Sequence, residues 1–206
     1  MYIDFSKVGA VLLAAGGSSR LGFPKQLLEL NEKTLVARTC ETILETGIEN
    51  LIVVTGAYED DIKKSISSHP IKIAHNPDWE IGMASSIKTG ITELLKSNHT
   101  FEAVLICLCD QPFLDTHHIE ELIKKHYKTG KPIVASFYND LESVPALFSQ
   151  SLFDSLLKLK GQEGARKIIR KQPSLVANVP FPKGVYDVDT PEAWEKIKTL
   201  LLNTDD

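Results

Sequence analysis

The chain has 206 residues, of which 43% are hydrophobic and 24% are charged, a composition that suits one compact domain with a substantial core. Its 23 Lys and Arg residues against 27 Asp and Glu residues give a formal net charge of -4, with no block of like charge. We therefore expect neither nucleic acid nor a membrane surface as a partner, although a local basic pocket is compatible with this balance.

The N-terminal stretch carries one Lys before an apolar run that is too short to span a bilayer, and it lacks a signal-peptide layout. The three cysteines, Cys40, Cys107 and Cys109, form no disulfide framework, and no second pair or nearby His completes a zinc site. We expect a cytoplasmic protein whose cysteines are buried small hydrophobic residues.

Short apolar runs alternate with segments of helical periodicity. The runs predict buried strands at residues 8–14, 51–55, 71–75, 103–109 and 132–137. Between these runs, apolar residues at helical spacing predict four helices. Their inner faces are formed by Val36, Cys40 and Ile43; by Tyr58, Ile62 and Ile66; by Ile87, Ile91, Leu94 and Leu95; and by Ile119, Leu122 and Ile123. Strands separated by helices imply crossover connections, so we predict an α/β fold: a Rossmann-like three-layer αβα sandwich with a mostly parallel sheet.

The alternation becomes irregular after about Asp140. We expect a short strand at 144–148, short helices within 151–159 and 163–170, and a last helix capped by Thr190 with Pro191 at its first position. Without a linker or repeat, we treat residues 1–206 as one domain, with a nucleotide-binding half at about 1–112 and an acceptor-binding half at about 113–206.

A Gly-rich segment, AAGGSSRLGFPK at 14–25, follows the first predicted strand directly. It therefore lies at the sheet edge where open α/β proteins bind ligands. Gly16 and Gly17 allow backbone N–H groups to converge on an anion, and Arg20 and Lys25 add positive charge. A tight surface loop with two solvated cations is the alternative, but the position after a buried strand favours phosphate binding.

Two widespread phosphate-binding patterns do not fit this loop. Gly17 and Gly22 have P-loop spacing, but Phe23 stands where that motif needs Lys. In the dinucleotide pattern counted from Gly16, Ser18 and Leu21 replace the second and third glycines.

The segment LAAGGSSRLGFPK resembles the signature L-A-A-G-x-S-x-R-M-G-x-x-K of the MobA-like nucleotidyltransferases, which include the molybdenum cofactor cytidylyltransferases, and departs from it at Leu21 alone. The resemblance implies the fold of nucleotide-diphospho-sugar transferases and a loop that wraps a triphosphate, with Arg20 and Lys25 neutralising the phosphates. It implies nucleotide-binding residues at Leu13, Ala14, Ala15, Gly16, Gly17, Ser18, Ser19, Arg20, Lys25 and Ser86, the last from the match of NPDWEIGMASSIKTGI to a second family motif.

Acidic residues occur at two places that suit a metal. Asp110 in LCDQPFL ends the most apolar strand, where it could equally cap the turn before Pro112. Asp187 and Asp189 in YDVDTPEAW share one face if that segment is extended, although Asp189 also adjoins the cap of the last helix. The family has D-Q-P and D-I-D-T-P-E here, so the resemblance implies Mg²⁺ ligands at Asp110 and Asp187, with Asp189 as a partner.

The second half resembles the family less closely. Pro145 in VPALF and Arg166 in LKGQEGARKII match the family pattern and are the candidate acceptor-binding residues. Arg166 could pair with a phosphate of the acceptor, or it could equally be a surface helix arginine. Ser143 and Gln162 depart from the usual Gly and Asp, so the acceptor could differ from molybdopterin.

The resemblance implies a Mg²⁺-dependent cytidylyltransferase in which Lys25, Arg20 and Asp110 are catalytic. It would move CMP from CTP to the terminal phosphate of a molybdopterin-type acceptor, with a molybdoenzyme as a further partner. Ala15, where guanylyltransferase relatives have Gly, favours CTP over GTP. The competing hypotheses are a guanylyltransferase, a methylerythritol-phosphate cytidylyltransferase and a non-catalytic chaperone that carries the cofactor.

Overall fold

The computed structural model describes residues 3–18, 21–97 and 99–202. Within this part of the chain, seven strands form one sheet in the order β5–β4–β1–β6–β8–β7–β9. These strands are β1 (Val8–Leu13), β4 (Asn50–Thr55), β5 (Lys72–His75), β6 (Ala103–Leu108), β7 (Ile133–Tyr138), β8 (Leu141–Ser149) and β9 (Val176–Pro180). A small antiparallel ribbon, β2 (Glu29–Leu30) with β3 (Lys33–Thr34), stands apart from the sheet.

The sheet is mostly parallel, as predicted. Parallel pairs join β5 to β4, β4 to β1, β1 to β6, and β7 to β9. Among the described strands, β8 alone runs antiparallel to its neighbours β6 and β7. Asn139 and Asp140 connect β7 to β8 with φ angles of 51° and 55°, the left-handed backbone that a two-residue hairpin turn requires.

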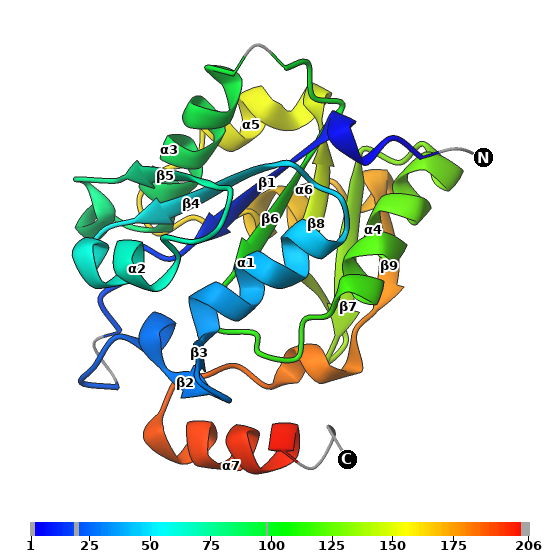
Figure 1. Ribbon diagram of the computed structural model, residues 1–206. Helices are drawn as coiled ribbons and strands as arrows, with labels where there is room; N and C mark the ends of the chain where they lie inside the picture. The colour runs from blue at the N-terminus through cyan, green and yellow to red at the C-terminus, as the bar shows by residue number, and fades with distance from the viewer. Residues whose placement is uncertain (1–2, 19–20, 98, 203–206) are drawn as a thin grey trace.

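Helices cover both faces of the sheet and produce the predicted three layers (Figure 1). Alternate residues of β1 point to opposite faces: Ala10 and Leu12 join the core beneath α1 (Leu35–Glu45), α2 (Glu59–Ser65) and α4 (Thr116–Thr129). Val11 and Leu13 join the core beneath α3 (Met83–Leu95), α5 (Phe153–Leu157) and α6 (Arg166–Lys171). Short 3₁₀ turns complete the chain at η1 (Phe5–Lys7), η2 (Lys25–Leu27), η3 (Trp79–Ile81), η4 (Gln150–Leu152), η5 (Pro173–Leu175) and η6 (Pro182–Val185).

The last helix, α7 (Pro191–Leu202), builds a third, smaller core. The hydroxyl of Thr190 accepts from the N–H of Ala193 at 3.1 Å, which confirms the predicted cap. Trp194 packs in a cluster with Leu21 and Leu30. In Figure 1, α7 lies beside the β2–β3 ribbon, away from the two helical layers.

The prediction for the cysteines is confirmed, whereas the prediction of the strands is incomplete. All three cysteines are free and buried. The strand expected at 144–148 is longer than predicted, and the sequence patterns did not predict β9 or the β2–β3 ribbon. None of the helices in the described chain combines the length and apolar character needed to cross a membrane.

The close packing of α3 on the sheet gives a stability prediction. A Cβ added at Gly90 would collide with Val11 and lie 3.0 Å from Cγ2 of Val54. We expect Gly90→Ala to lower the free energy of unfolding by about 1–3 kcal/mol, because overpacking outweighs the better helix propensity of Ala. Urea denaturation measures this change. Thr92→Ala, at an exposed position of the same helix, is the control, and an equal effect in both variants would contradict the packing argument.

Candidate functional site

The buried side chain of Gln26 anchors the Gly-rich loop after β1 through hydrogen bonds. This side chain is 1% exposed, and its Nε2 donates to the carbonyls of Ala14 (3.0 Å) and Gly16 (2.7 Å). Its Oε1 accepts from the hydroxyl of Ser18 at 3.2 Å, and the same hydroxyl accepts from the N–H of Lys25 at 3.1 Å. Gln26, which directly follows the loop, therefore anchors its first half.

Two further bonds orient the loop from the β4 side. The N–H of Ala57 donates to the carbonyl of Ala15, and the hydroxyl of Tyr58 donates to the carbonyl of Gly17, both at 3.1 Å. In a trans peptide the N–H points opposite to the C=O. With these carbonyls turned into the protein, the N–H groups that follow them face the other way, as an anion-binding nest requires.

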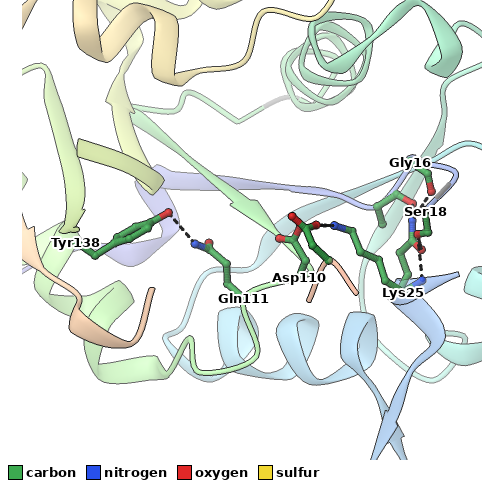
Figure 2. Close-up of polar contacts among 9 residues, drawn as sticks. Gly16, Ser18, Lys25, Asp110, Gln111 and Tyr138 are labelled. Carbon is green, nitrogen blue, oxygen red and sulfur yellow. Dashed lines mark hydrogen bonds and ion pairs between the residues drawn. The ribbon is translucent and has the colours of Figure 1, made fainter. Parts of the chain in front are cut away.

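Lys25 lies between two carboxylates (Figure 2). Its Nζ is 2.5 Å from Oδ2 of Asp110 and 3.2 Å from Oδ1 of Asp189. Burial acts to lower the pKa of Lys25, but the attraction and hydrogen bond of Asp110 outweigh it and hold that pKa above its ordinary value. Lys25 is therefore a permanent cation at this edge of the sheet.

The segment before α7 docks onto the end of β6. The N–H of Val188 donates to the carbonyl of Asp110 at 3.1 Å, and the Val188 side chain is fully buried. Its neighbours Asp187 and Asp189 thereby come close to Asp110. The Asp187 side chain is open to the solvent of the cleft, yet nearby protein atoms desolvate it and the charges of Asp110 and Asp189 repel it, so the pKa of Asp187 rises to about 6.

A cavity of about 350 Å³ opens beside the Gly-rich loop. Of the residues predicted to bind nucleotide or metal, it is lined by Leu13, Ala15, Gly16, Gly17, Lys25, Ser86 and Asp110. Trp79 also lines it, and its ring lies so close to Gly17 that a Cβ there would be 3.1 Å from two ring carbons. Trp79 therefore packs against the loop.

The start of α3 brings Ser86 to this cavity. Asn76, which is 1% exposed, donates from Nδ2 to the hydroxyls of Ser85 (2.8 Å) and Ser86 (2.9 Å). Ser85 is further occupied by bonds to the carbonyls of Asp78 and Gly82. Asn76 thus orders the helix start, and Ser86 rather than Ser85 faces the cavity.

A second cavity, of about 290 Å³, adjoins the first. Leu108 at the end of β6 lines both cavities. Asp187 and Arg166 line the second one, together with Gln111 and Tyr138. Two ligand-sized spaces therefore meet beside the Lys25–Asp110 pair.

Not every predicted site residue reaches these cavities. Ala14 is buried behind the loop, and Ser18 is engaged in holding it. Pro145 is buried within β8, where its carbonyl accepts from the hydroxyl of Ser136 at 2.6 Å. Ser19 and Arg20 lie outside the described residues.

Sequence reasoning did not select Gln26, Gln111 or Tyr58 as site residues. All three are uncharged, and their importance lies in the backbone carbonyls and hydroxyls that they contact. The adjacency of Gln26 to Lys25 in PKQ and of Gln111 to Asp110 in DQP was the available signal.

The acidic cluster fits a divalent cation. Oδ1 of Asp110 is buried and has no hydrogen-bond partner among the described residues, although buried carboxylate oxygens are normally satisfied. Carboxylates are the hard oxygen ligands that Mg²⁺ and Mn²⁺ accept. Within the described chain, no group of three or more His, Cys, Asp or Glu side chains has the arrangement of a ready-made metal site.

The raised pKa of Asp187 makes folding stability depend on pH. Folding raises this pKa from 3.8 to about 6, so the folded state binds protons more tightly and stability falls as pH rises through that window. We expect Asp187→Asn to be more stable than the wild type at about pH 7, and to lose this advantage below about pH 4. Urea denaturation across that range measures the difference.

Glu195→Gln, at an exposed position on α7 outside the cluster, is the matched control and should show no such pH-dependent gain. An Asp187→Asn variant that is equally destabilised at both pH values would contradict the assigned desolvation and repulsion of this carboxylate.

The chain is similar to several known proteins. A relative from Paenarthrobacter nicotinovorans named nicotine blue oxidoreductase is 33% identical over 84% of this chain and 86% of its own length. A probable molybdenum cofactor guanylyltransferase from Peptoclostridium acidaminophilum is 29% identical over 71% of this chain and 64% of its own. Among solved structures, the homologue of Mycobacterium tuberculosis Rv0371c from Mycobacterium sp. strain JC1 superposes with a TM-score of 0.84 at 29% identity, covering 97% of this chain and 98% of that one.

The family comparison covers most of the sheet and both walls of the first cavity. Residues 10–176 match the MobA-like NTP transferase domain. This range contains the Gly-rich loop, Lys25, Asp110 and the start of α3. The chain therefore belongs to the MobA-like NTP transferase family and is a nucleotidyltransferase of that family.

Proposed function

We propose that the protein transfers CMP from CTP to the terminal phosphate of a molybdopterin-type acceptor and releases pyrophosphate. The observation that carries this proposal is the meeting of Lys25, Asp110 and Asp187 at the point where two cavities adjoin. One cavity would hold the nucleotide and the other the acceptor, broadly the division into residues 1–112 and 113–206. The division is not strict, because Gln162 lines the first cavity and Gln111 the second.

The first cavity suits a nucleoside triphosphate. Its volume of about 350 Å³ lies in the range of small-ligand sites. The loop amides after β1 would cradle the phosphates, with Lys25 as a nearby point charge. Ser86, at the start of α3, would contact the ribose or a phosphate.

Nucleotidyltransferases of this family typically use a divalent metal ion, and we propose Mg²⁺ here. Asp110 and Asp187 would hold it, with Asp189 close by, and the unpartnered Oδ1 of Asp110 would gain a ligand. Bound there, the ion would neutralise charge on the phosphates.

The reaction needs positioning more than covalent help from the protein. A phosphate oxygen of the acceptor forms a bond to the α-phosphorus of CTP while the bond to the bridging oxygen breaks, and pyrophosphate leaves with that electron pair. Lys25 stabilises the negative charge that spreads over the phosphates, and the fixed loop amides do the same at no cost in reorganisation. An anionic phosphate nucleophile needs no general base.

Ala15 is the basis for preferring CTP to GTP. It lines the first cavity and is 4% exposed, so its methyl group takes space beside the loop that a purine could use. The guanylyltransferase relative keeps GTP as the competing donor. A methylerythritol-phosphate cytidylyltransferase and a non-catalytic carrier of the cofactor are two further candidate functions.

Substitutions at the centre of the cluster test the catalytic assignment. We expect Lys25→Ala and Asp110→Asn each to lower pyrophosphate release by about 10²-fold or more. The first removes a positive charge aimed at the reacting phosphates, and the second removes a charged ligand of the proposed metal ion. The assay follows pyrophosphate with CTP and molybdopterin. Lys33→Ala, which removes an exposed lysine paired with Glu41, should retain wild-type turnover. Near-normal activity in either cluster variant would refute the roles given to these residues.

Donor choice is tested by the same assay with CTP and GTP in parallel. We expect faster turnover with CTP, and Ala15→Gly should shift the ratio toward GTP by relieving the crowding. Faster wild-type reaction with GTP would make the protein a guanylyltransferase. Binding of CTP without pyrophosphate release would favour a carrier, and redox turnover of an acceptor without pyrophosphate release would match the name of the Paenarthrobacter relative.

A further inference from the structure

Two residues that line the second cavity each have a buried polar atom without a protein partner. These atoms are Oε1 of Gln111 and Nε of Arg166, and neither has a hydrogen bond to any residue that the structure describes. The Gln111 side chain is 3% exposed. Buried polar groups are normally hydrogen-bonded, so each exception in a native protein calls for an explanation, such as a catalytic role or a bound species.

The orientation of the Gln111 amide is determined by its other contacts. Its Nε2 donates to the carbonyl of Val144 at 3.2 Å, and a carbonyl can only accept. Nε2 also reaches the hydroxyl of Tyr138 at 3.1 Å (Figure 2). The amide nitrogen is therefore fixed on the β8 side, which leaves the oxygen as an unmet acceptor.

The lining of the same cavity includes a residue with an unmet donor and several apolar side chains. Nε of Arg166 is a donor only. Burial raises the pKa of the Tyr138 phenol, and the negative charge of Asp187 adds to the rise, while the nearby positive charge of Arg166 acts weakly against it. Leu141 and Val185 line the space at its exposed side, with exposures of 40% and 49%.

A phosphate group cannot satisfy both atoms. A phosphate dianion accepts from Arg166 but has no proton to give to the oxygen of Gln111. A flat ring whose edge carries an N–H beside a C=O satisfies both, and its faces suit apolar walls. The charged end of such a ligand would then point past Leu108 toward Lys25 and Asp110.

We propose that Gln111 and Arg166 are the specificity-determining residues of the acceptor site, and that they recognise the lactam edge of a planar heterocycle rather than a phosphate. This inference rests on the proposed function for its view of the second cavity as the acceptor site. It makes Arg166 the partner of a ring carbonyl and not of the acceptor's phosphate, and it explains why an uncharged glutamine lies next to Asp110.

Binding of pterin, a fluorescent 2-amino-4-oxopteridine with a lactam edge, tests the inference without any turnover. We expect saturable quenching of pterin fluorescence by the wild-type protein, and dissociation constants raised about tenfold or more in Gln111→Met and Arg166→Met, since each loses one hydrogen bond of the edge. Inorganic phosphate in excess should not displace the pterin. Gln150→Met, which alters an exposed glutamine that lines neither cavity, is the matched control and should bind pterin like the wild type.

Three results would overturn the inference: no pterin binding by the wild type, unchanged binding in Arg166→Met, or displacement of pterin by phosphate. Gln111→Met could fail to fold because the carbonyl of Val144 loses its donor. In that case the inference is tested by Arg166→Met, which changes a partly exposed residue of α6. Pterin binding with no pyrophosphate release from CTP would leave the inference standing while the proposed transferase activity fails. Release of pyrophosphate from CTP without any binding of pterin would refute this inference and leave the proposed transferase activity standing.

Discussion

The ion pair between Lys25 and Asp110 is the contact on which the candidate site depends. It joins residues 85 positions apart, one after the Gly-rich loop and one at the end of β6. Lys25 also reaches Asp189, 164 positions away. Among the described residues, one cation faces three carboxylates, which leaves an excess of negative charge. Desolvation and this excess together raise the pKa of Asp187. A further cation would balance the cluster.

The sheet determines why these residues meet. β1 and β6 are parallel neighbours, with Leu13 opposite Leu108, so the segments that follow them leave the sheet at the same edge. β8 lies antiparallel next to β6 and brings Val144 beside Gln111. The first cavity therefore borders parallel strands and the second borders the antiparallel strand.

The sequence predicted the elements whose signal is local. β1, β6 and α3 have dense apolar patterns, and the Gly-rich loop and Asp110 could be placed at the sheet edge from strand order alone. β9 was missed because VANVP is short and carries a proline, and its place is set by pairing with β7. The Asn139–Asp140 turn makes β8 antiparallel. Strands separated by helices predict parallel crossover connections, so the sequence pattern did not predict this reversal. Gln26 and Gln111 were missed because the groups they satisfy are backbone carbonyls and hydroxyls from distant segments, and their importance exists only in three dimensions.

The docking of Val188 on Asp110 has a consequence for synthesis on the ribosome. Asp187 and Asp189 follow every described strand of the sheet, whereas Lys25 and Asp110 emerge much earlier. A nascent chain can thus form the first ion pair as soon as β1 and β6 associate, and it acquires the remaining acidic residues last. Since no complete cluster exists before the segment ahead of α7 has left the exit tunnel, partly made chains lack the full set of groups that we assign to the triphosphate and its metal.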